Sequence, residues 1–173
     1  MTYNSVDDLL QALANAITDN REQLTLTAAK AAEAALKERV FNNGQAADGS
    51  RIGTYSTELG RYGASAFAVK SKFKPNPNRR TVTLPDGYAE LRSLNGRQTG
   101  YVDLQYTGSL LLSIKTTATG DGHAVAIMND REAAIADGNE KRFGKTIFAA
   151  GTAETEAMQQ AIELELQAIF DLL

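Results

Sequence analysis

Both ends of the chain follow the period of an α-helix, whereas glycines and prolines interrupt the middle. Ser5 is a good N-cap with Asp8 three residues on, and the apolar residues that follow fall on one helical face: Val6, Leu9, Leu10, Leu13 and Ile17. An alanine-rich stretch from about Leu24 to Phe41 predicts a second helix. Thr152 opens a final amphipathic helix. This order of elements predicts an α+β fold.

The middle of the chain predicts loops with short elements between them. Residues 44–63 contain five glycines and no lasting period, which predicts a long loop with at most one short strand, at Arg51 to Tyr55. Thr81–Leu84 alternates like a strand, and Tyr88 to Leu94 has the spacing of a short helix.

A Thr-Gly step at Gly108 predicts a sharp turn into a buried element, because glycine adopts backbone angles closed to other residues. Periodicity cannot decide between strand and helix for Tyr101–Tyr106 and Leu110–Thr116. His123–Met128 is typical of a strand buried on at least one face, and Asp130–Arg142 is typical of a helix with Ala133, Ala134 and Ile135 facing inward. The expected fold is a small mixed or antiparallel sheet packed with N-terminal helices and a long C-terminal helix, with long glycine-rich loops.

The periodic positions also predict the core. We expect ten apolar side chains to be mostly buried: Leu9, Leu13, Leu36, Val40, Leu110, Ile114, Ile127, Ile162, Leu166 and Ile169. The glutamates of the last helix suggest a solvated face: Glu154, Glu156, Glu163 and Glu165.

Composition favours a protein without catalytic chemistry. The chain has 173 residues, enough for one domain with a real core, and a formal net charge of -3, which provides no overall basic field for nucleic acid. There is no cysteine, and His123 is the only histidine. A structural role for His123 is the preferred interpretation, and a metal pair with Asp121 is the weaker one. We therefore expect no enzyme activity and no catalytic, cofactor or metal site.

The start of the chain and its hydropathy indicate a protein outside the membrane. The first residues lack a basic start and carry Asp7 and Asp8, so no signal peptide is expected. No apolar stretch is long enough to cross a bilayer.

The segment Lys70–Arg80 carries five positive charges and two prolines, and it has three interpretations. It is a solvated loop, a nucleic-acid contact made by its charges and Phe73, or a contact with an acidic face of a neighbouring subunit. The candidate subunit-interface residues are Arg51, Tyr55, Lys70, Lys72, Phe73, Lys74, Arg79 and Arg80.

Three segments, taken in order, resemble the phage virion-morphogenesis and tail-completion proteins, a family of small neck and tail-end proteins. The first runs from Val40-Phe41 through Gly44 to the sequence DGSRIGTY at 48–55. The second runs from Asp103 to Ile114 and contains TGSL. The third runs from Ala134 through Arg142-Phe143-Gly144-Lys145 to Phe148, ahead of the last helix.

The resemblance implies a single domain over residues 1–173, with residues 1–20 as an added helix and 21–173 as the family body. It implies a structural virion protein that forms a hexameric or dodecameric ring at the head-tail junction or the head-proximal tail end. Its partners would be further copies of itself and neck, connector or tail-tube proteins, with passing contact with DNA in the lumen and none with a membrane. It would be located in the virion, and in the host cytoplasm during assembly. The alternative is a nucleic-acid-binding accessory protein that uses Lys70–Arg80.

Overall fold

The computed structural model describes residues 5–68, 73–76, 78, 80–105 and 107–171, and the chain divides into two compact units. Unit 1 comprises Met1–Ser50 and Leu104–Leu173, and unit 2 comprises Arg51–Asp103. The fold class is α+β, as predicted. Among the described residues each unit contains one antiparallel two-stranded sheet, so two small sheets take the place of the one expected.

Unit 1 begins with the two expected helices, α1 (Val6–Asp19) and α2 (Arg21–Lys37). The Ser5 hydroxyl oxygen accepts a hydrogen bond from the Asp8 backbone N–H at 3.1 Å, which confirms the predicted cap. The helix α2 continues into a π-helical turn, η1 (Glu38–Asn42). The alanine stretch is therefore helical as predicted, with a wider last turn.

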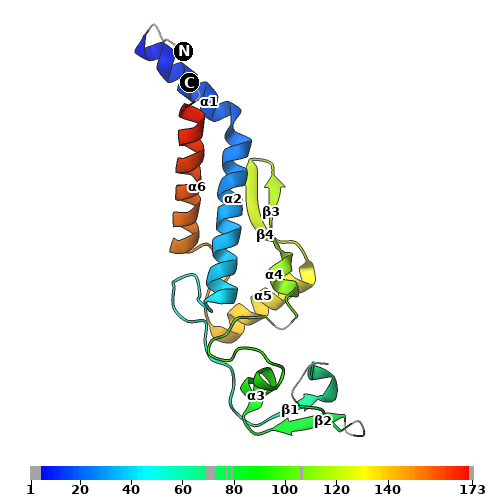
Figure 1. Cartoon of the computed structure of the whole chain (residues 1–173). Helices are drawn as coiled ribbons and strands as arrows, with labels where there is room; N and C mark the ends of the chain where they lie inside the picture. The colour runs from blue at the N-terminus through cyan, green and yellow to red at the C-terminus, as the bar shows by residue number, and fades with distance from the viewer. Residues whose placement is uncertain (1–4, 69–72, 77, 79, 106, 172–173) are drawn as a thin grey trace. The chain divides into compact units, whose positions relative to one another are not determined.

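The long C-terminal helix α6 (Thr152–Phe170) packs along α2. Figure 1 shows α6 on one side of α2 and a β-hairpin on the other. The alanines Ala28, Ala29 and Ala32 of α2 are buried. Because their side chains are small, they let neighbouring elements approach the backbone of α2 closely, and α2 forms the centre of unit 1.

The β-hairpin pairs β3 (Ile114–Thr119) with β4 (Gly122–Ile127). The predicted strand at His123–Met128 is confirmed as far as Ile127, but no residue of β4 is fully buried, so the predicted buried face is wrong. The short helix α4 (Ser109–Ser113) leads directly into β3. Gly108 precedes α4 with φ of 82°, in the left-handed region that the predicted turn requires. The segment Leu110–Thr116, for which periodicity left both alternatives open, is thus helix first and strand afterwards.

Helix α5 (Asp130–Phe143) follows β4 and differs from the prediction in the face that it buries. Glu132 and Ala136 are buried, whereas Ala133, Ala134 and Ile135 are exposed, so the predicted inward face is wrong. In this mostly polar helix, the short run of apolar residues does not lie on the face that packs against the rest of the unit. Gly144 ends α5 in the left-handed conformation, with φ of 62°.

Unit 2 pairs β1 (Gly60–Gly63) with β2 (Thr81–Leu84) and adds a 3-10 turn, η2 (Ala64–Ala66), and helix α3 (Gly87–Leu94). The predictions for β2 and α3 are confirmed. The strand expected at Arg51 to Tyr55 is wrong, because this segment belongs to no strand and the first strand of the unit lies further along the chain.

The burial predictions hold for five of the ten residues: Leu36, Val40, Leu110, Ile114 and Ile169. Four are half-buried: Leu13, Ile127, Ile162 and Leu166. Leu9 is 37% exposed, so its assignment to the core is wrong. Periodicity identifies an apolar face but not what covers it, and no residue of α1 is buried.

Glu33 connects α2 to the edge of the hairpin. Its carboxylate accepts hydrogen bonds from the Thr116 backbone N–H at 2.6 Å and from the Thr116 hydroxyl at 2.9 Å. The Lys37 ammonium donates to the other carboxylate oxygen. Burial acts to raise the pKa of Glu33, but the hydrogen bonds from Lys37 and Thr116 outweigh it and the pKa is lowered.

We predict that Leu110→Ala lowers the free energy of unfolding by about 2–5 kcal/mol, because it leaves a cavity in the core of unit 1. The matched control is Leu112→Ala in the same helix, where the side chain is 68% exposed and the change should be within about 0.5 kcal/mol. Urea unfolding followed by circular dichroism measures both. Equal effects of the two substitutions would contradict the assignment of Leu110 to the core.

We predict that the free energy of unfolding falls less between neutral and acidic pH in Glu33→Gln than in the wild type. Because the folded pKa of Glu33 lies below the ordinary value of 4.5, the carboxylate stabilises the fold above that value. This contribution is lost as pH falls through the lowered folded pKa. Urea midpoints between about pH 7 and about pH 3 should therefore differ most between wild type and variant at the neutral end. Glu163→Gln, at an exposed position of α6, is the control and should leave the pH profile unchanged.

Candidate functional site

The described members of the predicted interface set all belong to unit 2. Arg51, Phe73, Lys74 and Arg80 are exposed, and Tyr55 is half-buried. Lys70, Lys72 and Arg79 lie outside the described residues. The structure thus places most of the described predicted residues at the surface, and their role as an interface stays a prediction.

The structure brings Phe73 and Arg80 together with Arg61 in one open groove along β1 and β2. The groove has a volume of about 750 Å³, and Thr81 and Val82 of β2 contribute to its lining. Arg61, which the sequence analysis did not single out, donates from Nε to the Thr81 hydroxyl at 2.9 Å. We call these residues, with Asn76 and Thr83, the basic groove.

Phe73, the aromatic residue of the basic groove, packs against another aromatic residue of unit 2. The ring centroids of Phe73 and Phe67 lie 5.2 Å apart, and the Phe73 side chain remains 36% exposed. Two guanidinium groups beside an apolar ring suit a ligand that combines negative charge with apolar surface. The lining thus has the chemistry that an acidic amphipathic segment or a nucleic-acid strand would require of its partner.

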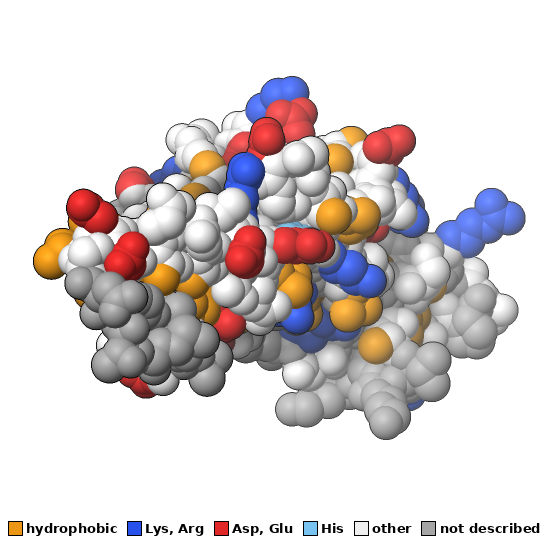
Figure 2. All heavy atoms as spheres, turned by 90° about the horizontal axis from the view of Figure 1, so that it is seen from above, with side chains coloured by type: hydrophobic (Ala, Val, Ile, Leu, Met, Phe, Trp, Pro, Cys, Tyr) orange, Lys and Arg blue, Asp and Glu red, His pale blue; other side chains and the backbone are white. Residues whose placement is uncertain are grey.

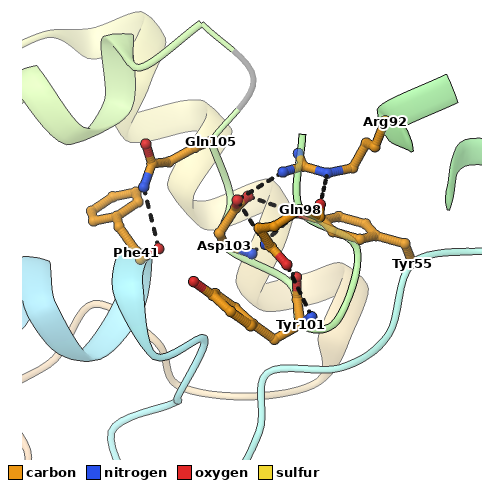
Figure 3. A network of polar contacts seen from close by, with 7 residues as sticks. All are labelled: Phe41, Tyr55, Arg92, Gln98, Tyr101, Asp103 and Gln105. Carbon is orange, nitrogen blue, oxygen red and sulfur yellow. Dashed lines mark hydrogen bonds and ion pairs between the residues drawn. The ribbon is translucent and has the colours of Figure 1, made fainter. Parts of the chain in front are cut away.

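Tyr55 lies in a polar network, which Figure 3 shows. Its hydroxyl donates to Asp103 Oδ1 at 2.7 Å and accepts from the Asp103 backbone N–H at 3.0 Å. Arg92 pairs with Asp103 Oδ2 at 2.7 Å, and its guanidinium lies 4.3 Å from the centre of the Tyr55 ring. Arg92 and Asp103 are both buried, so this ion pair forms the centre of unit 2.

The side-chain amide of Gln98 closes the network with three hydrogen bonds. Its amide nitrogen donates to Asp103 Oδ2 and to the Tyr101 carbonyl, each at 2.7 Å, and its amide oxygen accepts from the Tyr101 N–H at 3.2 Å. Burial, and hydrogen bonding to Asp103, raise the pKa of Tyr55 well above its usual range. The hydroxyl therefore stays protonated at physiological pH and holds Asp103 in place.

A second buried ion pair, between Arg39 and Glu154, lies in unit 1 at 2.7 Å. Arg39 also donates to the carbonyls of Gln45, Ile147 and Ala149, each at 3.0 Å. The other Glu154 oxygen accepts from the Gly151 N–H at 2.7 Å. Glu154 is buried, so the prediction that it lies on a solvated face is wrong. The guanidinium of the buried Arg39 compensates the charge of the Glu154 carboxylate.

The two units carry net charges of opposite sign. Residues 51–103 contain nine Lys and Arg against four Asp and Glu, for a net charge of +5. The rest of the chain contains nine Lys and Arg against seventeen Asp and Glu, for a net charge of -8. The overall value of -3 conceals this division, which a charge count by segment would have found.

His123 makes a contact within unit 1: its Nδ1 lies 3.3 Å from the Thr25 hydroxyl. Within the part of the chain that the structure describes, no group of three or more His, Cys, Asp and Glu side chains is placed to hold a metal ion. No helix among the described residues is long and apolar enough to cross a membrane.

Comparison with known proteins found no protein-family model, no curated protein and no solved structure that matches this chain.

We predict that Tyr55→Phe lowers the free energy of unfolding by about 1–3 kcal/mol, because it leaves the buried Asp103 without two hydrogen bonds. Tyr101→Phe is the matched control, since Gln98 bonds the backbone of Tyr101 in this network. Thermal and urea unfolding compare the two variants. A Tyr55→Phe protein as stable as wild type would contradict the role assigned to the hydroxyl.

Proposed function

We propose that this protein is a structural component of a phage virion that assembles into a ring at the head-tail junction or the head-proximal end of the tail. The observation that carries the proposal is the division of charge, with +5 on unit 2 and -8 on the rest of the chain. A chain with two surfaces of opposite charge attracts further copies of itself, and copies that join by two different surfaces form closed rings or filaments.

The three segments that resemble the tail-completion family support the placement in a virion, because their parts in unit 1 lie together. The Ala47 N–H of the first segment donates to the Thr146 carbonyl of the third at 2.9 Å. Lys145 Nζ donates to the Ser50 hydroxyl at 2.7 Å. Segments separated by about a hundred positions thus form one body, as expected if they are the common part of a family fold.

The second segment joins the same body. The Gln105 amide donates to the Phe41 carbonyl of the first segment at 3.2 Å, and α4 packs against α5 of the third. On this proposal the partners are further copies of the chain in a hexameric or dodecameric ring, neighbouring neck, connector or tail-tube proteins, and DNA that passes through the lumen. The protein acts in the virion, after assembly in the host cytoplasm.

We predict that phage lacking this protein make heads and tail tubes but do not join them, or make tubes of uncontrolled length. Electron microscopy of lysates from the deletion, with the gene supplied in trans as the control, measures this outcome. Normal joined virions without the protein would refute the proposal.

The basic groove favours a second candidate function, binding of nucleic acid by an accessory protein. Arg61 and Arg80 would contact phosphates and Phe73 would stack on a base. Such binding weakens steeply with salt, because phosphate contacts release counterions. Titration of a labelled single strand at several salt concentrations tests it, and the absence of salt-sensitive binding removes this candidate.

A further inference from the structure

Helix α1 presents an apolar stripe that the described residues of unit 1 leave exposed. Val6 is 72% exposed, Leu10 58% and Ile17 42%. At 100° per residue these three positions lie within about 40° of one another around the helix axis. Leu13 and Ala16, on the adjacent side, are half-buried against the rest of the unit. The helix therefore packs with one side and leaves a neighbouring apolar side in solvent.

The charges of α1 restrict what can cover this stripe. Residues 1–20 contain no Lys or Arg and three acids, Asp7, Asp8 and Asp19. Figure 2 views the molecule from above Figure 1 and shows exposed orange apolar side chains beside red acidic ones at its left. Two such helices paired with each other would place like charges together, and an anionic lipid surface would repel them. A basic partner with apolar surface fits the stripe by both charge and apolar area.

The basic groove of unit 2 has those properties. Arg61 and Arg80 are exposed and line it together with Phe73 and Val82, in a unit of net charge +5. The stripe from Val6 to Ile17 spans about 16 Å at 1.5 Å per residue. The four residues of β2 span about 13 Å. The two surfaces carry opposite charge, both contain apolar area, and their lengths are similar.

We propose that α1 of one copy of the chain docks in the basic groove of a second copy, with Val6, Leu10 and Ile17 against Phe73 and Val82 and with Asp7 facing Arg61 and Arg80. This is helix-in-groove recognition between two different surfaces, so each copy has one of each and the contact repeats from copy to copy. The inference rests on the proposed function, since it assigns the contact through which the ring forms.

The test uses two charge-reversed forms of the full chain. The first is Arg61→Glu with Arg80→Glu, which keeps α1 and reverses the groove. The second is Asp7→Lys with Asp8→Lys, which keeps the groove and reverses α1. All four positions are exposed, so circular dichroism should show unchanged folding. Sedimentation at low salt measures self-association over a concentration series.

We expect the wild type to associate at low salt and to dissociate as salt screens the charges. Each reversed form alone should associate at least about tenfold more weakly, because like charges meet at the contact. Their mixture should regain association, because every groove then meets an α1 of opposite charge. Leu10→Asp should weaken association of the wild type, whereas Leu164→Asp, at a 75% exposed position of α6, should not.

Three outcomes overturn the proposal: a wild type that stays monomeric at low salt, a reversed form that associates as the wild type does, or a mixture that stays dissociated. A groove that binds a labelled single strand while the chain stays monomeric assigns it to nucleic acid and likewise overturns the proposal. Failure here is separate from failure of the proposed function. If the deletion phage lacks joined tails but both reversed forms restore them, the ring role stands and this contact does not.

Discussion

The buried pair of Arg39 and Glu154 holds unit 1 together. Burial of two charges carries a desolvation cost that their attraction offsets only when further hydrogen bonds satisfy both groups. Here the arginine meets one carboxylate and three carbonyls, and the carboxylate also accepts from a backbone N–H. These bonds join η1, the loop that follows it, the residues before α6 and the start of α6. Loss of either partner would leave an uncompensated buried charge.

Unit 2 relies on the same kind of interaction. Arg92 and Asp103 form its buried pair, and Tyr55 and Gln98 supply hydrogen bonds to the carboxylate. Asp103 is the last residue of the unit, so this network ties the end of the unit to α3 and to the segment near its beginning. Each unit thus contains one buried pair of an arginine and a carboxylate. The partners are far apart in sequence in unit 1 and separated by a loop in unit 2. Each pair therefore fixes the path of irregular backbone that no strand or long helix supports.

The two units differ in the charge and the apolar side chains that they expose. The acids and the exposed apolar stripe of α1 belong to unit 1, and the guanidinium groups around Phe73 belong to unit 2. A protein that works by assembly requires surfaces that remain unsatisfied within one copy, and charge of opposite sign on different surfaces favours contact between copies over contact between like surfaces. The proposed ring and the proposed docking of α1 both depend on this separation.

Local sequence determined the helices at both ends, β2, α3, β4 and the turn at Gly108, because these depend on periodicity, capping and the backbone freedom of glycine. It also indicated the basic segment that contributes Phe73 and Arg80 to the groove. It did not reveal that Arg61 joins them, since strand pairing of Arg61 with Thr83 brings the two segments together. Tertiary structure alone decided that Glu154 is buried and Leu9 exposed. Burial depends on which distant residues lie opposite a side chain. Arg39 lies opposite the Glu154 carboxylate, whereas too few of the described residues pack against Leu9 to bury it. The order of residues along the chain does not contain this information.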